Sequence, residues 1–226
     1  MQAWGRDVEV LAALGHGRSY GVRSRVAFRA LPGILETGLW AELASRPPAA
    51  TRALVTDVGN DIPAGFSAAQ ILMWVEEALD RLGRFTPDVV LTDIPIATIR
   101  ALSNAKFLTF RSIHFPSCRL SLAQVCDTAE QVSAGLARLA SDRRARFVPL
   151  DPDWYGFDPI HVRPSQWRRA WQEILGAPGD LSTEARLGEG LRLYFMRPER
   201  RWLFGVEQVA RQSGVELRSG GRVWLY

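Results

Sequence analysis

The sequence has almost no lysine and very little cysteine or histidine, and each shortage narrows the possible functions. Lys106 is the only lysine, so arginine carries nearly all of the positive charge. Cys118 and Cys126 are the only cysteines; two residues make no disulfide framework, and we expect both to be reduced. Together with His114 they have a loose metal-like spacing but lack a fourth ligand, which argues against zinc. We therefore expect neither a metal site nor a disulfide-based fold.

Long apolar runs and long basic runs are also missing. No stretch approaches the roughly 20 apolar residues of a membrane span, and the start of the chain, MQAWGRDVEV, lacks the basic segment and apolar block of a signal peptide. We expect a cytoplasmic protein with no membrane span. Acidic residues are interspersed among the arginines and the net charge is only +4, so a nucleic-acid partner is not expected.

What the sequence does contain is an alternation of short apolar stretches with helical patterns. Two S-x-x-Q capping signatures, beginning at Ser67 and Ser121, each precede an amphipathic helical stripe. Residues 97–116 fit an amphipathic helix or an irregular lid. Alternating strands and helices imply right-handed crossovers and a parallel sheet, in which the run at 8–14 would be a central strand covered on both faces. The expected strands are residues 8–14, 26–31, 51–58, 87–96 and 146–150, and further helices are expected at 34–43 and 164–175.

The pattern changes after a Pro/Gly cluster at residues 176–179, which is the best domain boundary. We therefore expect an α/β domain at 1–176 and a β-rich extension at 177–226 that packs on it, since the extension is too apolar for a solvated tail. The sequence leaves the oligomeric state open, because an exposed hairpin could close a dimer or cover the sheet. Two hairpins are expected, one pairing 191–196 with 202–204 and one pairing 215–217 with 223–225.

Candidate functional residues stand where the expected strands end. In an open α/β sheet, ligands bind outside the carboxyl ends of the strands. Ser19 follows the first expected strand within a glycine-rich turn, Gly33 follows the second, and Asn60 follows the third. Asp158 and His161 come after the fifth. Each residue alone is most often a turn former, but in a chain with three histidines the whole set favours a site.

The order of these short motifs, G-R-S, P-G, G-N-D and D-x-x-H, resembles that of the SGNH hydrolases, the GDSL esterase family. The resemblance covers residues 8–175 and implies a three-layer α/β/α fold around a flavodoxin-like parallel sheet. It implies that Ser19 is the nucleophile, His161 its base and Asp158 the acid that orients the base. It also implies an oxyanion hole formed by Ser19, the backbone N–H of Gly33 and the side-chain amide of Asn60.

The chemistry of ester cleavage asks for the same residue types. A serine hydroxyl is a weak nucleophile until a base takes its proton, and the imidazole needs a carboxylate to fix its tautomer and stabilise its charged form. The sequence departs from the family at Arg18, where an aspartate is usual, and in having V-G-N-D for G-x-N-D. Because Arg18 neighbours the nucleophile without replacing it, we expect activity to survive with altered substrate approach or local electrostatics.

The resulting expectation is a serine esterase or acyl hydrolase that cleaves an ester or thioester of a small molecule and needs no cofactor. The tryptophans at 154, 167, 171 and 202 are expected to be packing groups, and Trp154 and Phe157, near His161 in the sequence, are alternative candidates for the wall of an acyl pocket. A non-catalytic binding module with this fold and an acyltransferase that uses the same serine remain alternatives. The segment GRSYG also resembles the phosphate-binding loop of FAD-linked oxidases. The chain is much shorter than those enzymes and lacks the aspartate that usually follows their loop.

Overall fold

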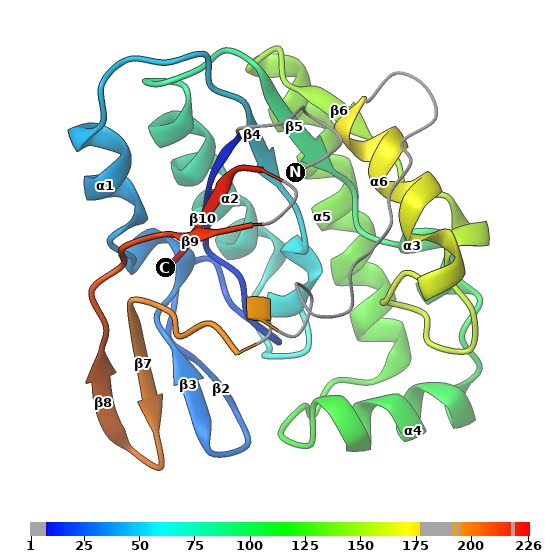
Figure 1. The fold of residues 1–226 in the computed structure, drawn as a ribbon. Coiled ribbons are helices and arrows are strands. Elements are labelled where there is room, and N and C mark those ends of the chain that lie inside the picture. Colours follow the sequence, from blue (N-terminus) through cyan, green and yellow to red (C-terminus); the bar gives the residue numbers. More distant parts are fainter. Residues whose placement is uncertain (1–7, 177–191, 194, 218–219) are drawn as a thin grey trace. The chain divides into compact units, whose positions relative to one another are not determined.

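The computed structural model describes residues 8–176, 192–193, 195–217 and 220–226 (Figure 1). The chain forms two compact units. The first combines Met1–Pro48 with Trp171–Tyr226, and the second is the continuous segment Ala49–Ala170. In the described part of the chain, no helix is both long enough and apolar enough to cross a bilayer.

The second unit is built on a three-stranded parallel sheet, in the order β4-β5-β6. Its strands are β4 (Ala53–Val55), β5 (Val89–Thr92) and β6 (Arg146–Val148). All four residues of the central strand β5 are buried, as expected for a parallel strand with both faces covered. The parallel arrangement predicted for these three strands is confirmed, and each is shorter than its apolar stretch.

The main helices of this unit are α2 (Ala68–Leu82), α3 (Ile96–Arg100), α4 (Asn104–His114) and α5 (Leu122–Asp142). Two of these four, α2 and α5, begin directly after the predicted capping residues Ser67 and Ser121. Ser121 and Gln124 form a complete capping box at the start of α5, and Ser67 Oγ accepts the backbone N–H of Gln70 at the start of α2. Helices α2 and α5 pack together. The stretch at 97–116 is therefore helical, divided between α3 and α4.

The first unit holds a sheet in the order β1-β10-β9, formed by β1 (Glu9–Ala12), β10 (Arg222–Leu225) and β9 (Val215–Glu216). In Figure 1 the blue β1 lies beside the red β10, and these two strands are parallel. β10 pairs antiparallel with β9, so the second predicted hairpin is confirmed. The prediction that residues 8–14 form a central strand covered on both faces is wrong: β1 is an edge of this sheet, and only Ala12 is buried.

A second sheet of this unit is antiparallel and has the order β2-β3-β7-β8. Its strands are β2 (Ser24–Val26), β3 (Arg29–Leu31), β7 (Arg200–Leu203) and β8 (Val206–Val209). The single strand predicted at 26–31 is wrong, because Ala27 has a φ of 53° and the chain reverses there. The turn tips meet, since the rings of Phe28 and Phe204 stack with centroids 4.8 Å apart.

The predicted hairpin between 191–196 and 202–204 is also wrong. Strand β7 pairs with β8 around a two-residue turn, in which Phe204 and Gly205 both have positive φ, 51° and 83°; this is the backbone geometry that matches the twist of paired strands. Arg192 and Leu193 are helical, and residues 191 and 194 lie outside the described residues.

The remaining helical segments are short, and they are η2 (Ile34–Glu36), α1 (Leu39–Ser45), η3 (Val58–Asp61), η4 (Pro152–Trp154), η5 (Pro164–Gln166) and α6 (Trp167–Leu175). The protein is thus a mixed α/β protein with one three-stranded parallel sheet and two further sheets. The boundary expected after residue 176 adjoins residues outside the described ranges and stays a prediction, as does the three-layer arrangement.

Candidate functional site

Ser19 lies in a tight turn of the first unit, after β1. Its side-chain Oγ accepts the backbone N–H groups of Gly21 and Val22, at 3.2 and 3.1 Å. These bonds fix the direction of the side chain and use only the lone pairs of the oxygen, so the hydroxyl hydrogen is left to donate. Two N–H donors also favour negative charge on Oγ. Ser19 is only 3% exposed, so its hydroxyl is buried as well as held in one direction.

Gly33 packs directly against this serine turn. The next residue, Ile34, donates its backbone N–H to the main-chain oxygen of Ser19 at 3.0 Å. A Cβ atom on Gly33 would lie 2.7 Å from the backbone nitrogen of Val22 and 2.8 Å from the carbonyl carbon of Gly21. Since Gly33 has an ordinary φ of −56°, close approach of the backbone, and not an unusual conformation, requires glycine here. The structure therefore brings Ser19 and Gly33 together.

Arg18, the residue that departs from the family motif, is buried at 3% exposure. Its guanidinium donates to the carbonyl oxygens of Pro32 at 3.0 Å and Leu14 at 3.1 Å, and to the main-chain oxygen of Tyr226. Desolvation lowers the pKa of Arg18 to about 10, with a further contribution from the positive charge of Arg29. These contacts show that Arg18 ties the serine turn to the ends of β3 and β10.

Asp158 and His161 form a local pair in the second unit, in the loop after β6. Asp158 Oδ1 accepts the backbone N–H groups of Ile160 and His161, at 3.0 and 3.1 Å, and Oδ2 lies 2.7 Å from His161 Nδ1. Because Asp158 and His161 are three residues apart, the carboxylate can accept from the backbone of the turn and also contact the imidazole ring. The side chain of His161 is half exposed, at 51%.

The electrostatics of this pair favour an ionised carboxylate. Desolvation acts to raise the pKa of Asp158, but the hydrogen bond from Ile160 and the hydrogen bonds and charge of His161 outweigh it, and the pKa lies below its usual range. An ionised carboxylate can only accept, so Nδ1 of His161 carries the proton. Nε2 is then the ring nitrogen that can act as a base.

Asn60 lies in η3, the short turn that follows β4 in the same unit. Its backbone N–H donates to the carbonyl oxygen of Asp57 at 3.4 Å. Asp57 adopts the left-handed region, with φ 58° and ψ 30°, a strained conformation that is frequent at functional sites. Desolvation raises the pKa of Asp57, although the residue retains exposed surface, and the positive charge of His161 acts in the opposite direction. The turn after β4 and the loop carrying His161 therefore interact electrostatically.

Two further polar residues at this edge of the sheet were missed by the sequence reasoning. Asp93 directly follows β5; its Oδ1 accepts the backbone N–H of Ile94 at 2.8 Å and its Oδ2 accepts the hydroxyl of Ser133 at 2.9 Å. Desolvation raises the pKa of Asp93, although both hydrogen bonds act to lower it. Desolvation, with the charges of Asp57 and Asp93, also raises the pKa of Tyr155. The sequence did contain a signal for these positions, because a Thr-Asp pair occurs at the end of β4 (Thr56-Asp57) and again at the end of β5 (Thr92-Asp93).

The two aromatic residues predicted near His161 have different surroundings. Trp154 is fully buried, which agrees with its expected packing role and leaves it no exposed surface with which to line an acyl pocket. Phe157 is 71% exposed and contacts Phe110 of α4, with ring centroids 5.4 Å apart. The ring of His114, also on α4, lies 6.0 Å from the ring of His161. The ring of His161 therefore lies beside His114, which belongs to a small cluster of aromatic side chains on α4 and the loop of Phe157.

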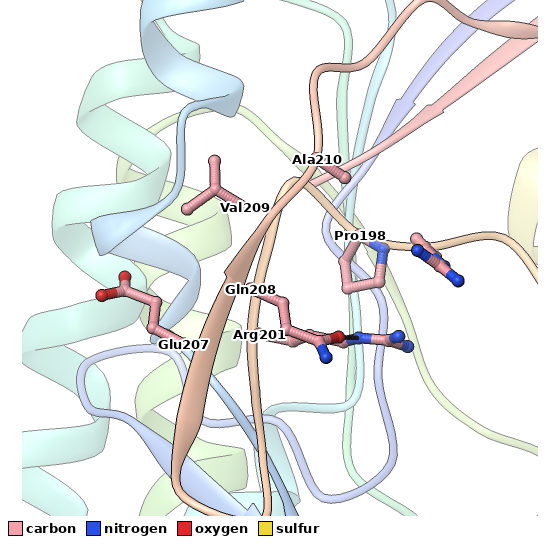
Figure 2. Close-up of a pocket in the computed structure, with 7 residues that line it drawn as sticks. Pro198, Arg201, Glu207, Gln208, Val209 and Ala210 are labelled. Atoms are coloured by element: carbon pink, nitrogen blue, oxygen red, sulfur yellow. Dashed lines mark hydrogen bonds between the residues drawn. The ribbon is translucent and has the colours of Figure 1, made fainter.

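A pocket of about 390 Å³ lies on the β7–β8 hairpin of the first unit. Figure 2 shows Arg201 and Gln208 among its lining residues; Arg201 Nε donates to Gln208 Oε1 at 2.8 Å. None of the residues predicted for the site lines this pocket. Nothing in its lining pairs a nucleophile with a base.

The predicted site residues thus fall into two groups, Ser19 with Gly33 in the first unit, and Asp158 with His161 and the turn of Asn60 in the second. Within the described ranges, no three His, Cys, Asp or Glu side chains are grouped as metal ligands would be. A scan against models of known protein families finds no match to this chain, and a search of curated proteins finds none either.

Proposed function

We propose that the protein is a serine esterase or related acyl hydrolase with a three-layer, flavodoxin-like fold of the SGNH type. The observation that carries the proposal is the pairing of Asp158 with His161 Nδ1 at 2.7 Å. A carboxylate on Nδ1 sets the tautomer of a general base and stabilises its charged form. The close packing of Gly33, the predicted oxyanion donor, on the turn of Ser19 supports the assignment of this serine as the nucleophile.

In the proposed reaction, Ser19 Oγ attacks the ester carbonyl carbon and its proton passes to His161 Nε2. The negative charge that develops on the carbonyl oxygen would be stabilised by the backbone N–H groups of Ser19 and Gly33 and by the side-chain amide of Asn60. Each such donor is worth roughly 3 to 4 kcal/mol in hydrolases of known mechanism. His161 then gives its proton to the leaving alcohol, and water releases the acyl group from Ser19.

A non-catalytic binding module is the second candidate, and one observation favours it. Ser19 is buried, and both bonds on its Oγ come from its own turn. A serine that only stabilises a turn makes the same contacts. The two functions differ in whether Ser19 reacts covalently.

Labelling with a fluorophosphonate probe tests the proposal. Peptide mass spectrometry should find the label on Ser19 of the wild type and no label in Ser19→Ala. Because a nucleophile and its base act as a unit, Ser19→Ala and His161→Ala should each remove most esterase activity, and the double variant should be little worse than either. Ser67→Ala, which removes a helix-capping hydroxyl in the second unit, is the control and should keep its activity. Label on another serine, or full activity in Ser19→Ala, would contradict the assignment.

A further inference from the structure

Three aromatic rings lie in contact near the proposed base: the half-buried rings of Phe110 and His114 and the exposed ring of Phe157. The ring of His114 lies 6.0 Å from that of His161 and stacks on Phe110, with centroids 5.9 Å apart and an interplanar angle of 16°. Phe110 in turn contacts Phe157, the residue directly before the turn from Asp158 to His161. We call Phe110, His114 and Phe157 the aromatic rim.

Local structure explains why these rings face one another. Phe110 and His114 are four residues apart on α4, so their side chains occupy the same face of the helix. Phe157 belongs to the loop whose backbone is held by the carboxylate of Asp158. The side chain of Phe157 is 71% exposed, and removing the apolar surface of an aromatic ring from water is favourable. The rim therefore offers apolar area that a ligand can cover.

The role of His161 determines which part of an ester would meet this surface. When the tetrahedral intermediate breaks down, the bond between the carbonyl carbon and the leaving oxygen breaks, the acyl group stays on Ser19 Oγ, and the proton on His161 Nε2 moves to the leaving oxygen. The leaving oxygen must therefore lie within hydrogen-bond reach of that nitrogen. Groups attached to this oxygen are therefore the part of the ester that lies nearest to His161 and to the adjacent ring of His114.

We propose that the aromatic rim binds the alcohol part of the substrate, so that the protein prefers esters of apolar alcohols, aromatic ones above all. This inference rests on the proposed esterase function, because it uses the proton transfer from His161 to assign the group. It differs from the acyl pocket expected from the sequence, since the acyl group would be bound elsewhere. Lys106 Nζ lies 5.5 Å from the centre of the Phe157 ring, and this cation at the rim disfavours alcohols that carry a positive charge.

Two ester series separate the alcohol part from the acyl part. The first keeps the acetyl group and compares methyl, butyl and benzyl acetate; the second keeps methanol and compares methyl acetate, butyrate and phenylacetate. In the wild type, kcat/KM should be about tenfold higher for benzyl than for methyl acetate, and Phe157→Ala should remove most of this preference. Ile113→Ala, which truncates a 68% exposed residue on the same helix but outside the rim, should keep it. The inference is wrong if Phe157→Ala changes the acyl series and not the alcohol series, or changes neither.

A binding measurement decides the inference even if the catalytic proposal fails. Titration of the protein with benzyl alcohol should shift the ring-proton NMR signals of His114 and His161, and Phe157→Ala should shrink these shifts by at least half. If Ser19 takes no fluorophosphonate label but the shifts are seen, the esterase proposal fails and the aromatic rim is still a site for apolar alcohols. If the signals do not move in the wild type, or move equally in Phe157→Ala, the rim is not a binding surface.

Discussion

Asp158 makes several polar contacts in the loop after β6, and its ionisation should make the stability of the protein depend on pH. The carboxylate accepts two backbone N–H groups as well as the imidazole of His161, and these contacts hold its pKa below the usual range. In the unfolded chain the pKa would be about 3.9. The native state therefore binds this proton less readily than the unfolded state.

This difference predicts how stability changes in acid. A lowered native pKa contributes to the free energy of unfolding above the unfolded pKa, and the contribution is lost as the pH falls through the native pKa. Between about pH 5 and pH 3, the wild type should lose more stability than Asp158→Asn, as measured by urea unfolding. The difference should be modest because the side chain is 36% exposed. Asp153→Asn, in the same loop, is the control, and equal slopes in wild type and Asp158→Asn would contradict the interpretation.

Among the elements, the turn after β3 depends on the absence of a side chain at Gly33. The backbone of the serine turn lies where a Cβ would be, 2.7 Å from the nitrogen of Val22. Backbone atoms cannot swing aside as the end of a flexible side chain can, so both the serine turn and the start of η2 would have to shift.

Gly33→Ala should therefore lower the free energy of unfolding by about 1 to 3 kcal/mol and should reduce reaction of the probe with Ser19. Gly83→Ala is a matched control at the end of α2, because the added Cβ would lie 3.4 Å from its nearest neighbour and φ is an ordinary −59°; it should be nearly neutral. Urea unfolding of the wild type and the two variants measures the change in stability, and the extent of labelling by the fluorophosphonate probe measures the reaction at Ser19. A stable Gly33→Ala would show that the serine turn adapts easily.

Elements that are stabilised by contacts between residues close in the sequence could be predicted, and elements that depend on distant partners could not. The helices α2 and α5 begin at Ser67 and Ser121 because each capping contact spans only three residues. The turn from Asp158 to His161 is equally local, and its motif was visible in the sequence. Strand pairing is not local: β1 finds its neighbour in β10 and β3 finds its neighbour in β7, and apolar alternation does not record such partners. Asp57 and Asp93 were missed because both fell inside the strands expected at 51–58 and 87–96, whereas β4 ends at Val55 and β5 ends at Thr92.

At the scale of the whole molecule, the N-terminal and C-terminal segments share two sheets. Strand β10 is the only hydrogen-bonded neighbour of β1 among the described strands, and β7 lies between β3 and β8. A chain that ends at residue 179 would lose the described partner of β1, which is β10, and one of the two partners of β3, which is β7. We expect such a chain to be insoluble or to melt at a clearly lower temperature, measured by circular dichroism. An unchanged melting temperature would show that the strand pairings contribute little to stability.

The parallel pairing of β1 with β10 also has a consequence for synthesis on the ribosome. The segment Ala49–Ala170 is continuous, so its parallel sheet can assemble while the rest of the chain is still being made. β1 leaves the ribosome earlier, but Arg222 is added roughly 10 to 40 s after Ala12 at typical rates of translation. During that interval the open edge of β1 has no strand to pair with, and it is then that the nascent chain is most in need of a chaperone.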